Sequence, residues 1–173
     1  MSVPVFSPNG IPPRIAQPLK RWSHDVQSFL RRAHRNDGSI AAIQNWTDIP
    51  YRSSLFTFSG TGAWVVTQPN IANLMYARAD RVLFLKGAIV STNVTAPLGT
   101  ELRVGLPEDF RWKSFAVDYL IYSDAGAAFA AGAAVMPAGA RYLSLQTLAF
   151  GNWTATAGND TTVYFNVCGD IRL

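Results

Sequence analysis

The sequence predicts an all-β fold, a jelly-roll-like antiparallel β-sandwich of about eight strands, preceded by a proline-rich arm and one α-helix. Short runs of alternating apolar and polar residues follow one another from residue 46 onward. Turn-forming residues separate these runs at intervals of roughly eight to fourteen residues. The long apolar run at residues 82–90 is typical of a strand that is partly buried on both faces. We therefore assign residues 46–173 to one β-sandwich domain.

Residues 1–17 are predicted to form an extended docking arm. They contain Pro4, Pro8, Pro12 and Pro13, and such a segment favours polyproline-like backbone and cannot build a core of its own. We expect the arm to lie along another protein chain. The side chains expected to make this contact are Val5, Phe6, Ile11 and Arg14.

Residues 18–45 are predicted to form an amphipathic helix and a linker. Pro18 suits the first turn of a helix, and Gly38 stands where a C-terminal cap is expected. Residues spaced three and four apart form the apolar seam of a short coiled coil, which indicates an oligomer. The seam consists of Leu19, Trp22, Val26, Phe29 and Ala33. An equally good interpretation packs this apolar face on the chain's own β domain.

The first half of the β domain contains five expected strand regions. Residues 54–59 and 63–68 read as a hairpin around the turn at residues 59–62. A short strand at residues 74–78 is expected to turn into the long strand at 82–90. Residues 102–106 alternate with the period of a strand that has one face in water, and we expect this strand to pair with the long one.

The second half is expected to complete the sandwich. Phe110 and Trp112 form an aromatic plug, and residues 115–122 and 142–147 alternate as strands do. Residues 125–140 are rich in alanine, which favours a helix, but three glycines and Pro137 interrupt them. We expect a strand of small side chains there, where another backbone approaches closely. Residues 161–167 supply the closing strand, next to a lone Cys168 that reads as a small strand residue.

The sequence offers little catalytic chemistry. The two histidines, His24 and His34, both precede the β domain, so a Ser-His-Asp or Cys-His arrangement within that domain is excluded. No phosphate-binding glycine loop is present. Glu101, Glu108 and Asp109 invite a glycosidase interpretation, but acidic residues are ordinary in the turn after Pro107. We expect no enzyme activity, no cofactor and no metal site.

The charge distribution limits the choice of partners. Residues 1–38 hold six basic and two acidic residues, and so carry the whole net charge of +4. The basic cluster within them is too short and mixed to favour a nucleic acid over a protein or water. Charged residues make up 15% of the chain, fewer than the roughly 25% of a typical soluble domain, which burial in an oligomer would explain. We expect no membrane insertion and no signal peptide.

A loop tryptophan is the clearest candidate for a binding residue. Trp153 stands beside Asn152 in a polar loop where no core residue is expected. Exposed flat rings bind sugar faces or fill protein interfaces, so both residues are candidates for receptor contact. The alternative, of similar weight, is that Trp153 folds back over the end of the sandwich.

Several anchor residues together resemble a β-sandwich domain that recurs in bacteriophage virion proteins. They are Trp46-Thr47, Trp64-Val65-Val66, the strand with Tyr76, the strand at residues 82–90 and the segment from Leu102 to Pro107. In that family the domain commonly ends tail-fibre-like appendage proteins, after a variable N-terminal segment. The resemblance covers about residues 46–173 and implies no site residues.

The resemblance and the residue patterns together predict a non-enzymatic phage virion protein, assembled in the host cytoplasm. We expect a homotrimer that docks to other virion proteins, of tail or capsid, through residues 1–36. It would display the β-sandwich for attachment to a host surface glycan or protein. The first alternative is a capsid decoration protein, and the second is a jelly-roll capsid protein with a basic arm that faces the genome. A carbohydrate-active enzyme is a third alternative.

Overall fold

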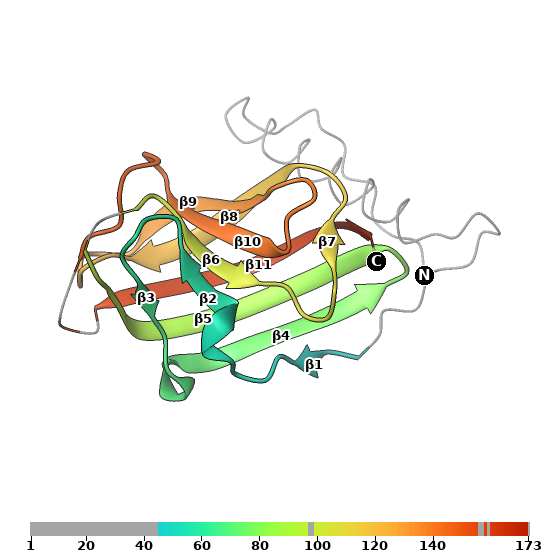
Figure 1. Ribbon diagram of the computed structural model, residues 1–173, viewed down its shortest axis with the longest axis horizontal. Coiled ribbons are helices and arrows are strands. Elements are labelled where there is room, and N and C mark those ends of the chain that lie inside the picture. The colour runs from blue at the N-terminus through green and yellow to red at the C-terminus, as the bar shows by residue number, and fades with distance from the viewer. Residues whose placement is uncertain (1–44, 97–98, 156–157, 159, 173) are drawn as a thin grey trace, which may run out of the picture. The chain divides into compact units, whose positions relative to one another are not determined.

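The computed structural model describes residues 45–172, except 97–98, 156–157 and 159 (Figure 1). The predicted arm, the predicted helix and its seam therefore lie outside the described residues. The described strands are β1 Thr47–Asp48, β2 Phe56–Phe58, β3 Trp64–Val65, β4 Ile71–Ala79, β5 Val82–Val94, β6 Leu102–Gly105, β7 Arg111–Trp112, β8 Ala116–Ser123, β9 Ala130–Met136, β10 Tyr142–Thr147 and β11 Thr161–Arg172. Two short 3-10 turns, Ser53–Leu55 and Gln68–Asn70, connect strands in the first part.

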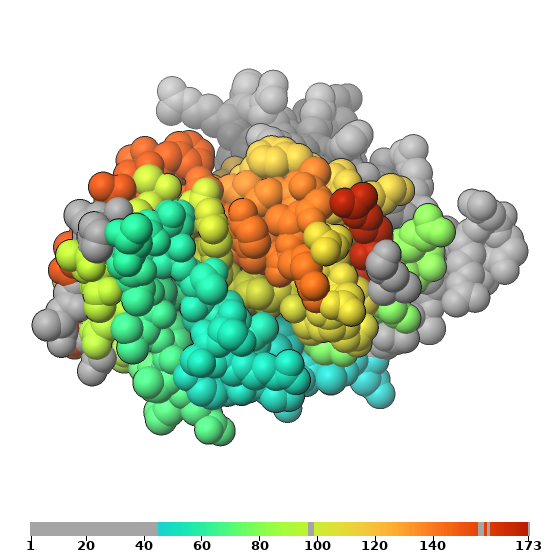
Figure 2. All heavy atoms as spheres, viewed as in Figure 1, coloured from blue at the N-terminus to red at the C-terminus, as the bar shows by residue number. Residues whose placement is uncertain are grey.

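All eleven strands belong to one antiparallel sheet that curls around a shared core. Its main order is β1-β4-β5-β11-β8-β9-β10-β6-β2, with β3 paired to β5 and β7 paired to β11. Figure 2 shows β2, β3, β6 and β10 on one face, where they hide the middle of β4 and β5. The all-β antiparallel fold is confirmed, and its two layers are halves of one curled sheet.

Two predicted strand pairings are wrong. Strands β2 and β3 do not form a hairpin, because β2 pairs with β6 and β3 with the far end of β5. Strand β6 does not pair with the long strand β5 either, but lies between β10 and β2. In both cases the loop between the two segments carries the chain across the core to the other layer. The predicted turn between β4 and β5 is confirmed, with Asp80 at a φ of 53°.

The alanine-rich segment is a strand, as the sequence predicted. Strand β9 pairs with both β8 and β10. A Cβ atom added to Gly132 would lie 2.5 Å from the main-chain oxygen of Gln146, too close for any side chain. A Cβ atom at Gly87 of β5 would likewise collide with the ring of Phe165 on β11. These two glycines let the neighbouring strands curve inward over the core.

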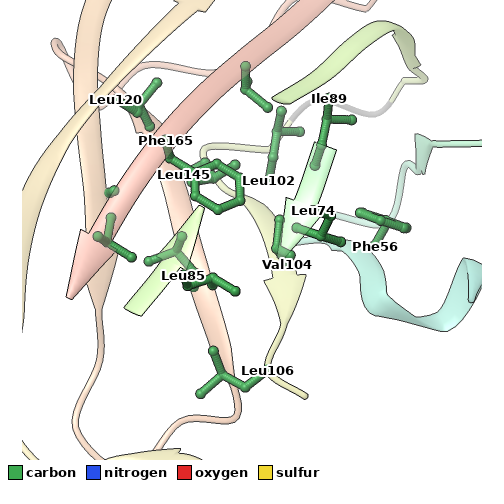
Figure 3. Packing of buried hydrophobic residues seen from close by; sticks show 14 of the residues in the cluster. Phe56, Leu74, Leu85, Ile89, Leu102, Val104, Leu106, Leu120, Leu145 and Phe165 are labelled. Atoms are coloured by element: carbon green, nitrogen blue, oxygen red, sulfur yellow. The ribbon is translucent and has the colours of Figure 1, made fainter. Parts of the chain in front are cut away.

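The core fills the inside of the curl with aliphatic and aromatic side chains from both layers. Leu85 and Ile89 of β5 face Leu102 and Val104 of β6 across it, as Figure 3 shows. The predicted aromatic plug is confirmed, because Phe110 and Trp112 are 1% and 0% exposed. The indole nitrogen of Trp112 donates a hydrogen bond to the carbonyl oxygen of Tyr142 at 2.9 Å. Burial of these side chains supplies most of the favourable free energy of folding.

Four loops meet at one end of the sheet, which we call the loop end. They are residues 59–63, 95–101, 124–129 and 148–160. Main-chain hydrogen bonds join them: Thr95 to Ala63 at 2.8 Å, Trp153 to Gly99 at 3.0 Å and Gly126 to Asp160 at 3.0 Å. The β4–β5 turn and the segment after Pro107 lie at the opposite end, where the Ile171 amide bonds to the Arg81 carbonyl at 2.7 Å.

Candidate functional site

Trp153 is buried, and this corrects its prediction as a receptor contact. Its side chain is 0% exposed, and its indole nitrogen donates to the carbonyl oxygen of Leu145 at 3.3 Å. The ring packs edge-on against Tyr122, with 5.1 Å between the ring centroids. The alternative interpretation, a tryptophan folded over the end of the sandwich, is therefore confirmed. Asn152, the other predicted contact, is exposed beside it.

The exposed apolar residues of this loop are Leu148 and Phe150, each 61% exposed. Phe150 has a φ of 52°, a left-handed conformation that is unfavourable for a residue with a bulky side chain. The turn is closed around it: its amide bonds to the Thr147 carbonyl at 2.9 Å, and the Gly151 amide bonds to the Thr147 hydroxyl at 3.0 Å. The loop thus holds two apolar side chains in water at a strained turn.

The buried tryptophan explains how this loop keeps its shape. Trp153 anchors one side of the loop in the core, while the Thr154 amide donates to the Asp124 carboxylate at 3.0 Å. The contact with Asp124 also links this loop to the neighbouring loop at residues 124–129. Phe150 therefore projects from a loop that is held on both sides, which we call the braced platform. We call Leu148, Phe150 and Asn152 the tip residues.

A second exposed apolar surface lies on the outer side of β8, where Val117, Tyr119 and Ile121 are 55%, 73% and 54% exposed. Tyr164 of β11 lies directly opposite Ile121, and the rings of Phe129 and Tyr164 have centroids 5.9 Å apart. Phe115 continues the row at the start of β8. We call these six residues the β8 face.

The three carboxylates of the glycosidase alternative do not come together as a pair across a cleft. Glu101 precedes β6 and forms an ion pair with Arg103 at 2.8 Å. Glu108 follows β6 at the opposite end of the sheet and accepts a hydrogen bond from the Tyr76 hydroxyl at 2.9 Å. Asp109 forms an ion pair with Arg141. Each carboxylate therefore already has a structural partner.

Tyr76 is the titratable group that this arrangement perturbs. Burial raises the pKa of the Tyr76 hydroxyl above its ordinary value, and the hydrogen bond and negative charge of Glu108 add to the increase. The neighbouring Arg78 acts in the opposite direction. Arg78 also lies over the ring of Phe110, which packs edge-on against Tyr76. The cluster joins β4 to the segment after β6.

Other kinds of site find no support among the described residues. They contain no group of three or more His, Cys, Asp or Glu side chains placed to hold a metal ion. Within the same part of the chain, no helix has the length and apolarity needed to cross a membrane. The residues of the docking arm and the helical seam lie outside it, so both predictions stay untested.

Comparison with known proteins gave no relative: no family model, no curated protein and no solved structure matches the chain. The resemblance to phage virion domains therefore rests on the anchor residues alone. Trp64, Leu102 and Val104 hold structural positions in the core, while two other anchors, Trp46 and Val65, are exposed. Trp64 is 4% exposed and donates to the Thr92 hydroxyl at 2.8 Å, and Leu102 and Val104 are fully buried.

Sequence reasoning missed the β8 face and two of the tip residues, Leu148 and Phe150, while Asn152 was among the predicted contacts. The sequence has an apolar signal at Leu148 and Phe150, directly after the strand at residues 142–147, but no binding role was predicted for it. The row Phe115, Val117, Tyr119 and Ile121 was recognised as alternating, yet alternation alone does not say which row is buried. The available signal was that both alternating rows of β8 are largely apolar, although only one of them can face the core.

Proposed function

We propose that this chain is a non-enzymatic structural protein of a phage particle, and that its β domain is displayed for host attachment through the tip residues. The observation that carries the proposal is the loop end, where a braced platform holds Leu148 and Phe150 in water at a strained turn. Strained and exposed residues on rigid scaffolds are typical of binding surfaces. The resemblance to virion appendage domains supports the same proposal.

The arrangement of the sheet agrees with a display role. The first described strand, β1, pairs with β4 at Tyr76 and Met75, near the middle of β4. The tip residues lie at the loop end of the sheet, and the β4–β5 turn lies at the opposite end (Figure 1). In this proposal residues 1–36 make the attachment to the particle, and the tip residues meet a host glycan or protein.

The location of the protein is tested on purified particles of the virus that encodes it. Mass spectrometry should detect the chain, and gold-labelled antibody against residues 46–173 should mark an appendage. Labelling spread over the shell would instead favour the decoration alternative. Absence of the chain from purified particles would refute the proposal.

The attachment role is tested with Phe150→Gly in the full chain. Glycine adopts the φ of 52° without strain, so the variant should fold at least as well as the wild type while it loses the exposed ring. We expect cell binding by fluorescently labelled protein to fall at least about tenfold, as loss of an interface aromatic often causes. The matched control is Asp80→Gly, which relieves a φ of 53° at the opposite end of the sheet and should bind as the wild type does.

A further inference from the structure

We propose that the β8 face is the surface through which copies of this chain bind one another. This goes beyond the proposed function, because it names the contact within the homo-oligomer that the sequence predicts. The face consists of Val117, Tyr119 and Ile121 on β8, flanked by Tyr164, Phe129 and Phe115. Contiguous exposed apolar surfaces of this kind mark protein interaction sites.

The strand register makes this a continuous surface. Ile121 is paired with Tyr164 on one side and with Ala131 of β9 on the other. Tyr119 is paired with Ala133, and Val117 with Val135. Paired residues project from the same side of a sheet, so the row of large side chains on β8 runs beside a row on β9. In that β9 row Ala131 is exposed, whereas Ala133 and Val135 are buried.

The face also lacks charge. Asp118, the charged residue of β8, alternates with Tyr119 and therefore projects from the opposite side of the sheet. Strand β9 has no charged residue. On β11 the outward residues after Tyr164 are Asn166 and Cys168, and Asp170 comes later, near the other end of the sheet. The centre of the surface is thus neutral and apolar.

These features fit a second copy of the same chain. When identical subunits associate, charges on a shared surface risk meeting like charges, and a neutral face avoids this. The large row on β8 of one copy can lie against Ala131 of β9, the exposed residue of the outward β9 row, on the next copy. This contact can be repeated around a symmetric ring, and so suits the trimer expected from the sequence.

The area is sufficient for a specific contact. From their exposed fractions, the six side chains offer roughly 600 Å² per copy, if an aromatic side chain has about 200 Å² and Val or Ile somewhat less. A standard interface takes about 800 Å² from each partner, so the β8 face and its immediate surroundings can supply one.

The test uses the full chain and measures its oligomeric state by sedimentation velocity across the micromolar range. The wild type should associate, and the double variant Tyr119→Glu with Ile121→Glu should be monomeric or dissociate at a concentration at least about tenfold higher. The matched control is Val65→Glu, a strand valine 43% exposed on β3 and outside the β8 face, which should associate as the wild type does.

A second variant protects the test against misfolding. Tyr119→Thr with Ile121→Thr keeps good strand formers at both positions and should also weaken association while the circular dichroism of the sheet is retained. A wild-type chain that stays monomeric would overturn the inference. So would a folded threonine variant that associates as tightly as the wild type. The particle and cell-binding experiments do not depend on these results, so failure of the interface is distinguishable from failure of the proposed function.

Discussion

A comparison of the two sides of β8 shows that an alternating pattern identifies a strand but does not identify which of its two rows is buried. Leu120 is 1% exposed in the core, while its neighbours Tyr119 and Ile121 are among the most exposed apolar residues of the described chain. The outward row is the more apolar of the two, since Asp118 stands in the inward row. A rule that assigns the more hydrophobic row to the core would have placed the wrong face of this strand inside.

Substitutions of aromatic residues should give the largest difference in the free energy of unfolding between the inner and outer sides of β8. Trp153 packs on the inner side against Tyr122, and Trp153→Ala should lower the free energy of unfolding by about 3–5 kcal/mol. Tyr119→Ala on the outer side should change it by less than about 0.5 kcal/mol, because its ring is already in water. Urea denaturation of dilute protein measures both values. Similar losses in the two variants would contradict the comparison.

Substitutions of the two neighbouring aliphatic residues, Leu120 and Ile121, should show the same order of stability losses with a smaller difference. Leu120→Ala leaves a cavity in the core and should cost about 2–4 kcal/mol. Ile121→Ala should cost under about 1 kcal/mol, mostly from the lower strand propensity of alanine. Thermal unfolding at low concentration, where association contributes least, distinguishes them. A large loss for Ile121→Ala in dilute protein would mean that a part of the same chain covers it.

Strand β9 provides a comparison of two adjacent small residues. Gly132→Ala places a Cβ atom against the Gln146 carbonyl oxygen and should cost about 1–3 kcal/mol. Ala131→Val adds more volume, but Ala131 is exposed on the outer side, so stability should hardly change. Denaturation midpoints with unchanged slopes would show this directly. If both variants are tolerated, β9 and β10 do not approach as closely as described.

The smallest expected effect concerns pH. The raised pKa of Tyr76 means that the folded state holds this proton more tightly than the unfolded state. Its contribution to stability is therefore complete below the ordinary tyrosine pKa of 10.0, and it is lost as pH rises through the folded value. Tyr76→Phe should cost less than about 1 kcal/mol at neutral pH. The difference between variant and wild type should shrink above pH 10 in alkaline denaturation, and a constant difference would contradict the assignment.

The fold class, the strand positions and the alanine-rich strand could be predicted from local patterns. Alternation and turn residues act over a few positions, so they located β8, β10 and β11 without any knowledge of neighbours. Strand pairing could not be predicted in the same way. The segment at residues 59–62 has the composition of a hairpin turn, yet it leads from one layer to the other because β2 and β3 find partners elsewhere.

The candidate site was predicted less well, for a related reason. Whether Trp153 points outward or inward depends on the carbonyl of Leu145 and the ring of Tyr122, which only the folded sheet brings to it. The exposure of Phe150 depends in turn on that anchor. A loop sequence specifies which groups are available for binding, and the scaffold decides which of them reach the surface.

The order of the strands has a consequence for how the molecule behaves when crowded. The border strands of the described sheet are β1, with two residues, and β2, with three, so each border strand itself offers only a short run of unpaired backbone. Neighbouring molecules therefore find a poor template for adding strand to strand, which is the usual route to fibrils. If many copies are held close together on one particle, as we propose, they can then remain separate folded units and meet through side chains alone.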